Sequence, residues 1–486
     1  MRALDLAVIL AYLAGITWFG ARFRRSQRTL KDYFLGGKTA PWWAITFSIV
    51  STETSTLTVI GTPALAFTGN FGFLQVVFGY LLGRIVIAAL FLPHYFRGEM
   101  YTAYELIERR FGARLRRLTA GAFLLLRALA EGVRVFAISL VVSIVLGTGE
   151  FASILLIICL TLFYTFEGGL KAVIWTEVVQ MLLYIAGAVA SLLVLAQLVP
   201  QGWHGIWEAG HAAGKFQVFD FSLPHSGEYF ARTYTFWAGL LGGCFLSTAS
   251  HGAEQLIVQR LLAARNLRDS RLALLASWVV VFLQFVLFLL IGVALYAFYG
   301  AAGLAAPHPA DRIYPEFVWR YLPPGVAGLV IAAILAAAMS THSATLNALA
   351  STTVMDFWRP LASAGGSNSL SDASALRLAR GVTVFWEAVM LLIAWLARKW
   401  GPVLEAGLSI ASVLYGSLLG AFLLGLLTRR AGANAATVGM LAGLLVMVYV
   451  KAFTPIAWTW YALIGTLTTF LAGWITAVAL KEPVHD

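Results

Sequence analysis

Charged side chains are scarce in this sequence. Only 12% of its 486 residues are Asp, Glu, Lys or Arg, whereas 60% are hydrophobic. Soluble proteins carry roughly 25% charged residues, so water is excluded as the solvent for most of the surface. The length alone would suit about three soluble domains, but long apolar blocks follow one another without a linker. We therefore expect a single membrane domain.

Cysteine is nearly absent as well. Cys159 and Cys244 are the only two, and both lie in apolar runs. They are too few for a disulfide framework and do not form the CxxC pattern of a metal centre. The HExxH and GxSxG signatures are also missing, which argues against a membrane-embedded enzyme.

Apolar segments of membrane-spanning length are abundant. A bilayer core takes about 20 apolar residues per helix, and helices are expected because an open sheet cannot satisfy its backbone in lipid. Thirteen segments are candidates: 4–21, 42–67, 73–93, 118–146, 151–166, 172–199, 234–258, 272–299, 324–354, 382–396, 403–427, 435–450 and 457–480. The first is expected to be retained, since no small-residue cleavage site follows it.

Basic residues are distributed unevenly between alternate loops. Of the 34 Lys and Arg residues, 23 lie in loops on one side, 8 on the other and 3 within spans. Because cytoplasmic loops are the basic ones, this split predicts a multi-pass protein of the cytoplasmic membrane, with its N-terminus outside and its C-terminus in the cytoplasm. Anionic headgroups of the inner leaflet then explain the net charge of +11, and no nucleic-acid partner is expected.

Two spans contain polar interruptions. The second carries S-T-E-T-S-T-L-T (51–58), and the seventh carries Gly242, Gly243 and S-T-A-S-H-G (247–252). Polar residues in lipid are costly and usually functional, and interrupted helices at matching positions of two halves indicate a transporter site at the midplane. The alternative is that the hydroxyls join neighbouring helices, which holds for many single Ser and Thr residues.

A third polar stretch, A-A-M-S-T-H-S-A-T-L-N, offers ligands for a cation. Within it, Ala337, Ser340 and Thr341 share one helical face, so that two hydroxyls meet one carbonyl. Free carbonyls of an unwound stretch at Ser51 and Thr54 would complete a shell of five neutral oxygens. Hard oxygen ligands suit hard cations, and a shell without carboxylates suits a monovalent ion. Sodium is the natural candidate.

At these residues the sequence resembles the sodium:solute symporter family, from about residue 30 to residue 430. The resemblance is carried by S-T-E-T-S-T-L-T-V-I-G-T-P (51–63), Y-T-A-Y-E-L-I-E-R-R-F-G (101–112), E-G-G-L-K-A-V-I-W-T-E-V-V-Q (167–180), H-G-A-E-Q-L-I-V-Q-R-L-L-A-A (251–264) and A-A-A-M-S-T (336–341). It implies an all-α membrane protein with the LeuT-like fold. Two inverted repeats of five helices, about 42–199 and 234–427, would follow one extra helix (4–21) and precede two C-terminal helices (435–480).

The resemblance also implies an ion site. Family members couple inward sodium flow to solute uptake by alternating access, and their shared sodium site corresponds to the carbonyls of Ser51, Thr54 and Ala337 and the hydroxyls of Ser340 and Thr341.

Some members of the family bind a second sodium through an Asp in W-T-D-x-x-Q and further serines. Here Glu177 replaces that Asp, Ser343 is kept, and Ala344 stands where another hydroxyl would be. A second sodium at Glu177 and Ser343 and a stoichiometry of one sodium per solute both stay open.

Eight side chains near the interruptions are candidates for substrate binding: Glu53, Ser55, Thr58, Gln75, Arg134, Ser247, Ser250 and His251. Five are neutral hydroxyl or amide groups, which suit a polyhydroxylated or amide-bearing solute. Arg134 could hold a carboxylate through paired hydrogen bonds. The alternative for Arg134 is a self-neutralising ion-pair ladder with Arg127 and Glu131, which lie on the same helical face.

These observations predict a transporter and not an enzyme, with Na⁺ as the coupling ion. A compact hydroxylated or amino-bearing organic acid is the favoured solute, and a neutral sugar or amino acid, coupled to sodium or protons, is the alternative. The expected partners are the solute and the lipid bilayer, and a monomer is expected. A sensor is disfavoured because only six residues follow the last span, too few for an output domain.

Overall fold

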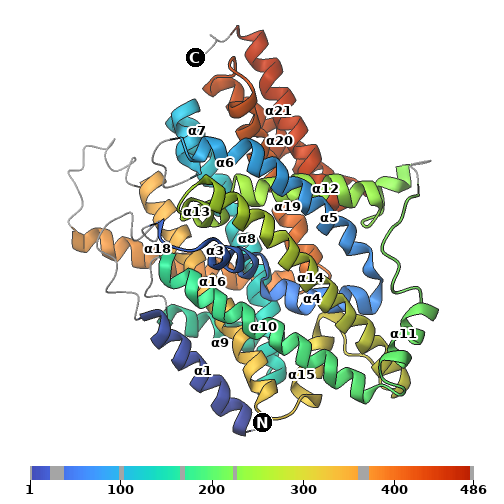
Figure 1. Cartoon of the computed structure of the whole chain (residues 1–486). Helices are drawn as coiled ribbons and strands as arrows, with labels where there is room; N and C mark the ends of the chain where they lie inside the picture. The colour runs from blue at the N-terminus through green and yellow to red at the C-terminus, as the bar shows by residue number, and fades with distance from the viewer. Residues whose placement is uncertain are drawn as a thin grey trace.

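The computed structural model describes residues 3–21, 38–97, 103–164, 170–222, 227–358 and 372–481. These residues form helices and connecting loops (Figure 1), and no β-strand occurs among them. The main helices are α1 (Ala3–Ala21), α3 (Trp42–Glu53), α4 (Thr56–Thr68), α5 (Leu74–Val86), α6 (Leu92–Tyr95), α7 (Tyr104–Phe111), α8 (Ala113–Leu146), α9 (Glu150–Tyr164), α10 (Leu170–Leu198), α11 (Trp203–Ala212), α12 (Phe236–Gly252), α13 (Gln255–Leu262), α14 (Leu267–Ala301), α15 (Ile313–Tyr321), α16 (Val326–Thr352), α18 (Asp372–Ala397), α19 (Val403–Leu427), α20 (Ala433–Phe453) and α21 (Tyr461–Ala479).

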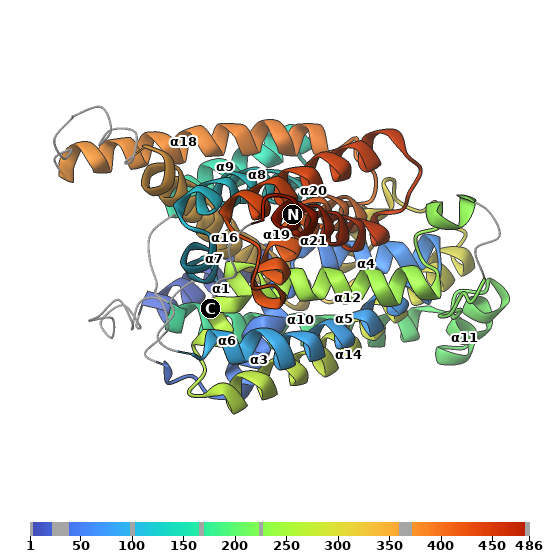
Figure 2. The same ribbon diagram turned by 90° about the horizontal axis from the view of Figure 1, so that it is seen from above.

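The long helices run roughly along one direction and form a bundle (Figure 2), with α11 near one end and α6 and α7 near the other. Within the described residues, seven helical segments are long and apolar enough to cross a membrane, and five shorter apolar helices accompany them. The prediction of an all-helical, multi-pass protein is confirmed, while the count of thirteen spans stays a prediction. The short span expected at 382–396 belongs to the longer helix α18, which begins at Asp372.

The first polar interruption breaks its helix, as the sequence predicts. α3 ends at Glu53, and α4 begins at Thr56. Thr54 (φ −82°, ψ 81°) and Ser55 (φ −82°, ψ 173°) lie outside the helical region of backbone conformation. Gln284 of α14 anchors this break, because its Oε1 accepts a hydrogen bond from the Thr54 hydroxyl at 3.0 Å.

The second break comes just after the polar stretch 247–252 and not within it. α12 continues through Gly252, and the chain leaves the helix at Ala253 and Glu254 before α13 begins. Two hydroxyls of the stretch bond back to their own helix: Thr248 donates to the carbonyl of Cys244 at 2.8 Å, and Ser250 donates to that of Ser247 at 3.3 Å. Ser247 instead donates to the carbonyl of Tyr80 in α5 at 3.4 Å. Bonds within α12 satisfy the hydroxyls locally, so the helix can continue through them.

Glycines let α5 and α12 touch backbone to backbone. A Cβ on Gly243 would lie 2.2 Å from the carbonyl oxygen of Val76, and one on Gly79 would lie 2.5 Å from that of Leu240. A Cβ on the neighbouring Gly242 would lie 2.0 Å from the carbonyl oxygen of Thr459, just before α21. Small residues at such contacts are the usual means of close helix packing in membranes. The pair Gly242 and Gly243 therefore belongs to packing, while the break at Ala253 lies nearly three helical turns further along the chain.

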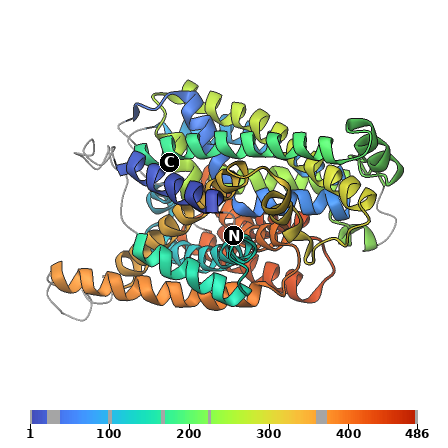
Figure 3. The same ribbon diagram turned by 90° about the horizontal axis from the view of Figure 1, so that it is seen from below.

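The first helix, α1, packs along α16 (Figure 3, dark blue). Its buried Asp5 accepts hydrogen bonds from the backbone N–H groups of Gly325 at 2.6 Å and Gly328 at 2.9 Å, at the start of α16. A carboxylate at a helix N-terminus satisfies free N–H groups and complements the helix dipole. This extra helix thus anchors the element that carries Thr341.

Candidate functional site

The break between α3 and α4 releases two backbone carbonyls. The N–H of Ser55, which would close the helical bond to the Ser51 carbonyl, donates instead to the carbonyl of Glu53 at 3.1 Å. The N–H of Thr58 likewise donates to the Ser55 carbonyl at 2.9 Å and not to that of Thr54. The carbonyls of Ser51 and Thr54 therefore lack their helical donors, as carbonyls at a helix end do.

A small cavity lies between this break and α16. It encloses about 20 Å³, enough for one water-sized particle, for which about 10–15 Å³ suffices. Its lining consists of Ser51, Thr54, Ser55, Thr56, Glu131, Arg134, Ile138, Glu177, Gln180, Ala338 and Thr341. We call it the ion cavity, because its size and oxygen-rich lining suit a bare cation.

Three of the five predicted sodium ligands meet at the ion cavity, namely Ser51, Thr54 and Thr341. α16 is helical through Ala337 and Ser340, the other two. The side chains at these two positions lie outside the described residues. The complete five-oxygen shell therefore stays a prediction.

The second predicted ion site centres on Glu177 and Ser343. Glu177 lines the ion cavity, and Arg260 donates Nη2 to its Oε1 at 2.6 Å and Nε to its Oε2 at 3.2 Å. The hydroxyls of Ser48 and Thr52 also donate to this carboxylate. The Ser343 side chain lies outside the described residues. Glu177 thus already has a cation at hydrogen-bond distance, and a second sodium there stays a prediction.

A larger cavity of about 150 Å³ adjoins the ion cavity. Seven of the eight predicted substrate-binding residues line it: Glu53, Ser55, Thr58, Arg134, Ser247, Ser250 and His251. Tyr80, Leu404 and Tyr415 are among its apolar and aromatic walls. We call it the solute cavity. Ser55, Arg134 and Thr341 line both cavities, so single side chains separate an ion in one from a solute in the other.

Gln75, the eighth candidate, lies elsewhere. Its Nε2 donates to the carbonyls of Gly72 and Tyr234, both at 3.1 Å, and its Oε1 accepts from the N–H of Asp220 at 3.1 Å. It is 1% exposed and does not line the solute cavity. The amide therefore joins the start of α5 to the segment that precedes α12.

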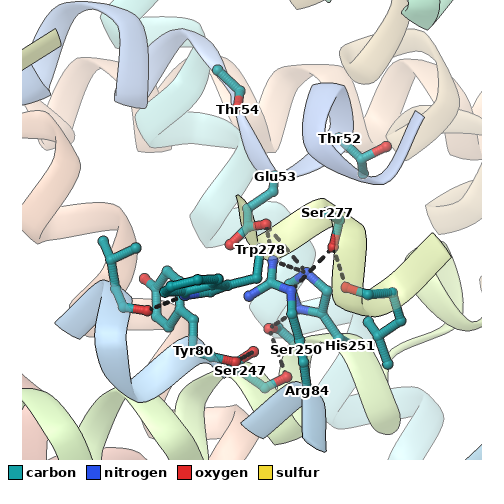
Figure 4. Close-up of polar contacts among 12 residues, drawn as sticks. Thr52, Glu53, Thr54, Tyr80, Arg84, Ser247, Ser250, His251, Ser277 and Trp278 are labelled. Atoms are coloured by element: carbon teal, nitrogen blue, oxygen red, sulfur yellow. Dashed lines mark hydrogen bonds and ion pairs between the residues drawn. The ribbon is translucent and has the colours of Figure 1, made fainter. Parts of the chain in front are cut away.

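Beside the solute cavity lies a buried ionic cluster that joins Arg84, which was not among the predicted site residues, to the candidates Glu53 and His251. Arg84 of α5 is fully buried, and its Nη2 donates to Glu53 Oε2 at 2.5 Å (Figure 4). His251 Nε2 lies 3.3 Å from the same carboxylate oxygen, and Ser277 accepts from Arg84 Nε at 3.1 Å. The cluster joins both broken helices to α5 and α14. The sequence feature that could have indicated this cluster is Arg84 itself, a single arginine inside an apolar span.

The second break has a similar ion pair. Glu254, in the gap between α12 and α13, accepts from Arg127 Nη2 at 2.5 Å, and both side chains are about 5% exposed. Each broken helix therefore has a carboxylate at its break, and each carboxylate is held by an arginine from another helix. Both pairs border the solute cavity, to which Glu53, Arg127 and Glu254 contribute.

Arg134 takes part in the predicted ladder only weakly. Its Nη1 donates to Glu131 Oε2 at 3.2 Å. Glu131 also accepts from the Thr345 hydroxyl at 3.2 Å and contacts His342 at 3.3 Å, and His342 in turn lies 3.0 Å from Glu387. The Nε of Arg134 is buried and has no hydrogen-bond partner in the described part of the chain. Because Glu131 serves several groups, it leaves most of the Arg134 guanidinium for another acceptor.

Comparison with known proteins agrees with this geometry. The sodium:solute symporter family model matches residues 33–443. The chain belongs to the sodium:solute symporter family. This symporter is 28% identical to the sodium/sialic acid symporter NanT of Aliivibrio fischeri, over 99% of the chain and 94% of NanT. It is 30% identical to sodium-coupled monocarboxylate transporter 1 of Mus musculus, over 87% of the chain and 68% of that protein.

The symporter also superimposes on solved structures. A Na⁺-coupled sialic acid symporter in a substrate-bound outward-open state matches with a TM-score of 0.82 and 28% identity, over 98% of each chain. Mhp1, a nucleobase-cation symporter, matches with a TM-score of 0.54 at 12% identity, over 93% of this chain, which shows the fold alone. The predicted LeuT-like fold, the family and Na⁺ as the coupling ion are confirmed. The exact repeat boundaries stay a prediction.

Proposed function

We propose that this symporter uses the inward flow of Na⁺ to take up a small organic acid, and that Arg134 binds the carboxylate. The observation that carries the proposal is the position of Arg134. It lines both the ion cavity and the solute cavity, and within the described residues its guanidinium makes one hydrogen bond, to Glu131. Its planar fork matches the geometry of a carboxylate.

Charge balance supports an anionic solute. The four charged residues of the solute cavity, Glu53, Arg127, Arg134 and Glu254, sum to zero, and a bound Na⁺ would add one positive charge. A buried charge is costly unless it is compensated nearby. A carboxylate on the solute supplies that compensation, so ion and solute together enter a neutral site.

Coupling between ion and solute follows from their shared residues. Na⁺ held by the carbonyls of Ser51 and Thr54 and the hydroxyl of Thr341 would fasten the break to α16. Ser55 and Thr341, which border the ion, would then be fixed on the wall of the solute cavity. Binding of either partner pre-organises the other's site, which is reciprocal coupling. Ala337 and Ser340 would complete the ion shell.

The names of the relatives also favour an acid. NanT is named as a sialic acid symporter, and the mouse relative as a monocarboxylate transporter. Both of these solutes bear a carboxylate. The hydroxyl-rich wall formed by Ser55, Thr58, Ser247 and Ser250 suits a hydroxylated acid, because each hydroxyl can both donate and accept.

The chain is proposed to lie with its N-terminus outside and its C-terminus in the cytoplasm, as a monomer. In support of this orientation, the bundle end formed by α7 and the start of α8 carries Arg109, Arg110, Arg114, Arg116 and Arg117. Basic residues prefer the cytoplasmic side. α11 lies near the opposite end (Figure 2).

Uptake into proteoliposomes tests the proposal. Labelled sialic acid is the first probe, offered with an inward Na⁺ gradient, a choline gradient or a proton gradient, and with lactate, glucose and alanine as competitors. The expected result is uptake driven by Na⁺ alone and inhibited most by the carboxylates. Arg134→Gln should weaken acid binding by about 30-fold or more, since a lost charge-assisted pair costs about 2 kcal/mol or more. The affinity of Arg134→Lys for the acid should lie between those of the wild type and Arg134→Gln, because lysine keeps the charge but not the planar fork.

The alternative solutes make different predictions. A neutral sugar that competes best, and whose affinity Arg134→Gln leaves unchanged, would reject the acid and leave Arg134 as a structural residue. Uptake driven equally by a proton gradient would reject strict sodium coupling.

A further inference from the structure

A large apolar groove lies on the outside of the bundle, away from both cavities. It encloses about 1160 Å³ between α8, α19 and α20, which pack side by side (Figure 2). Its lining consists of Arg114, Arg117, Leu118, Gly121, Ala122, Leu125, Leu129, Phe357, Ile410, Val413, Leu414, Leu444, Val448, Lys451 and Ala452. This volume exceeds the 300–1,000 Å³ typical of small-molecule pockets.

The groove follows one face of α8. Its α8 residues recur at spacings of three and four, from Arg114 to Leu129, which places them in a stripe about 22 Å long at 1.5 Å per residue. Leu125 is 56% exposed and Val448 is 58% exposed. The stripe is shorter than the hydrocarbon core of a bilayer, which is about 30 Å thick. A long, exposed apolar groove of this length is suited to a hydrocarbon chain.

Three cations line the groove: Arg114 and Arg117 on α8, and Lys451 on α20, whose Nζ donates to the Ser409 hydroxyl at 3.2 Å. Arg114 and Arg117 are both exposed. Arg114 makes one long contact, 3.5 Å from Nη1 to Asn434 Oδ1. Arg117 has no hydrogen-bond or ion-pair partner in the described part of the chain. The nearby Arg116 differs, since its Nη1 donates to Glu108 at 2.7 Å and it does not line the groove. Two unneutralised guanidinium groups thus flank the mouth of an apolar channel.

We infer that the groove binds an anionic phospholipid, with the phosphate on Arg114 and Arg117 and an acyl chain along α8 toward Leu129. Charge complementarity selects the headgroup: each arginine near the membrane surface is worth about fivefold in affinity for anionic lipid. The apolar length between the two ends selects the chain. The inference is independent of the transported solute, because the groove shares no residue with the solute cavity.

The position of the lipid bears on transport. Arg127 and Arg134 lie on α8 as well, and they line the solute cavity while the groove residues of α8 line the lipid side. α19 also contributes to both, through Leu404 to the solute cavity and Ile410 to the groove. A lipid bound in the groove would therefore contact α8 and α19, the two helices that also line the solute cavity, on their lipid-facing side.

Thermal unfolding of the delipidated full-length protein in detergent tests this site. Phosphatidylglycerol should raise the melting temperature of the wild type, and phosphatidylcholine with the same chains should do so far less. The double variant Arg114→Gln/Arg117→Gln should need about 25-fold more phosphatidylglycerol for half of the shift. Arg116→Gln removes an equal charge from the same turn and should behave like the wild type.

A second variant fills the channel without changing charge. Gly121 lines the groove, and a Cβ there would meet only the Phe357 ring, at 3.7 Å, and no backbone atom. Gly121→Phe therefore adds a large apolar side chain at the groove wall. It should abolish the phosphatidylglycerol shift and reduce the lipid that co-purifies, as counted by mass spectrometry.

Four outcomes would overturn the inference. Equal shifts with both lipids would show that the headgroup is not recognised. A shift reproduced by inorganic phosphate would indicate a free-phosphate site. A dimer that Gly121→Phe splits would make the groove an interface between copies. An unchanged lipid response in both variants would place the lipid elsewhere.

Discussion

Arg84 is the most deeply buried charge beside the solute cavity, and its partner is Glu53. Removing one member of such a pair leaves the other charge buried and uncompensated, which costs about 3–5 kcal/mol, whereas removing both costs much less. The 15% exposure of the Glu53 side chain to the cavity places the expected cost at the low end of that range.

Arg84→Met should therefore lower the thermal stability of the purified protein markedly. The double variant Arg84→Met/Glu53→Gln should recover most of the loss, because no unpaired carboxylate remains. Melting curves followed by size-exclusion chromatography measure both. If the double variant is as unstable as the single one, the ion pair is not what Arg84 contributes.

Asp311 lies in the loop between α14 and α15 and gives a pH-dependent prediction. It is 4% exposed; its Oδ2 accepts from the N–H of Val403 at 3.1 Å, and its Oδ1 has no hydrogen-bond partner in the described structure. Burial raises the pKa of this carboxyl from 3.8 to about 6. The folded state thus holds the proton more tightly than the unfolded one, so stability is lost as pH rises from about 4 to about 6.

Asp311→Asn should stabilise the protein at pH 7.5, by about 1–3 kcal/mol, and should have little effect at pH 4.5. The neutral amide keeps an oxygen for the Val403 N–H and avoids the buried charge. Melting temperatures of variant and wild type at both pH values measure this. A gain of equal size at the two pH values would contradict the raised pKa.

At the scale of the elements, the contact between α5 and α12 depends on glycine. Gly243→Ala would place a methyl group 2.2 Å from the carbonyl oxygen of Val76, so the two helices must separate. Overpacking of this kind costs about 1–3 kcal/mol. The melting temperature should fall for Gly243→Ala, and should stay unchanged or rise slightly for Gly15→Ala in α1, where an added Cβ would meet no neighbouring segment within 4 Å. Equal behaviour of the two variants would refute the close contact.

The elements show why some features could be predicted from the sequence and others could not. The break at Thr54 could be predicted, because six hydroxyls and a carboxylate in the eight residues 51–58 make a poor lipid-facing helix. The second break was expected within 247–252 and lies at Ala253. It could not be placed from the sequence, because side-chain rotamers decide whether a hydroxyl bonds back to its own helix. Gln75 was expected in the solute cavity because it is a polar residue in an apolar span. The local sequence does not show how far along the bundle a side chain lies, and Gln75 lies at the start of α5.

Ion pairs were the least predictable part of the site. Arg84, Glu53 and His251 come from α5, α3 and α12, far apart in the sequence, so their meeting is a property of tertiary packing. Seven of the eight solute-cavity candidates were found nonetheless, because they cluster around the two polar interruptions.

At the scale of the whole molecule, the basic end of the bundle predicts the orientation in the membrane. In a background with Cys159→Ser and Cys244→Ser, His211→Cys in α11 should react with a membrane-impermeant maleimide added outside intact cells. Arg265→Cys, between α13 and α14, should react only after the cells are opened. Both wild-type residues are exposed, so access and not burial decides the result. The reverse pattern would invert the proposed topology.

The central claim is that Na⁺ binds between the α3–α4 break and Thr341. The most direct measurement needs no solute: the melting temperature of the purified protein as NaCl replaces choline chloride at constant ionic strength. An ion that binds only the folded state stabilises it by mass action, by about 2.7 kcal/mol at 100 times its dissociation constant. We predict a saturable rise for the wild type and for Thr341→Ser, and a midpoint shifted at least about 10-fold to higher Na⁺ for Thr341→Ala, since about 1.4 kcal/mol or more is lost with one ligand. A wild-type midpoint in Thr341→Ala, or no difference between Na⁺ and choline in the wild type, would contradict the account.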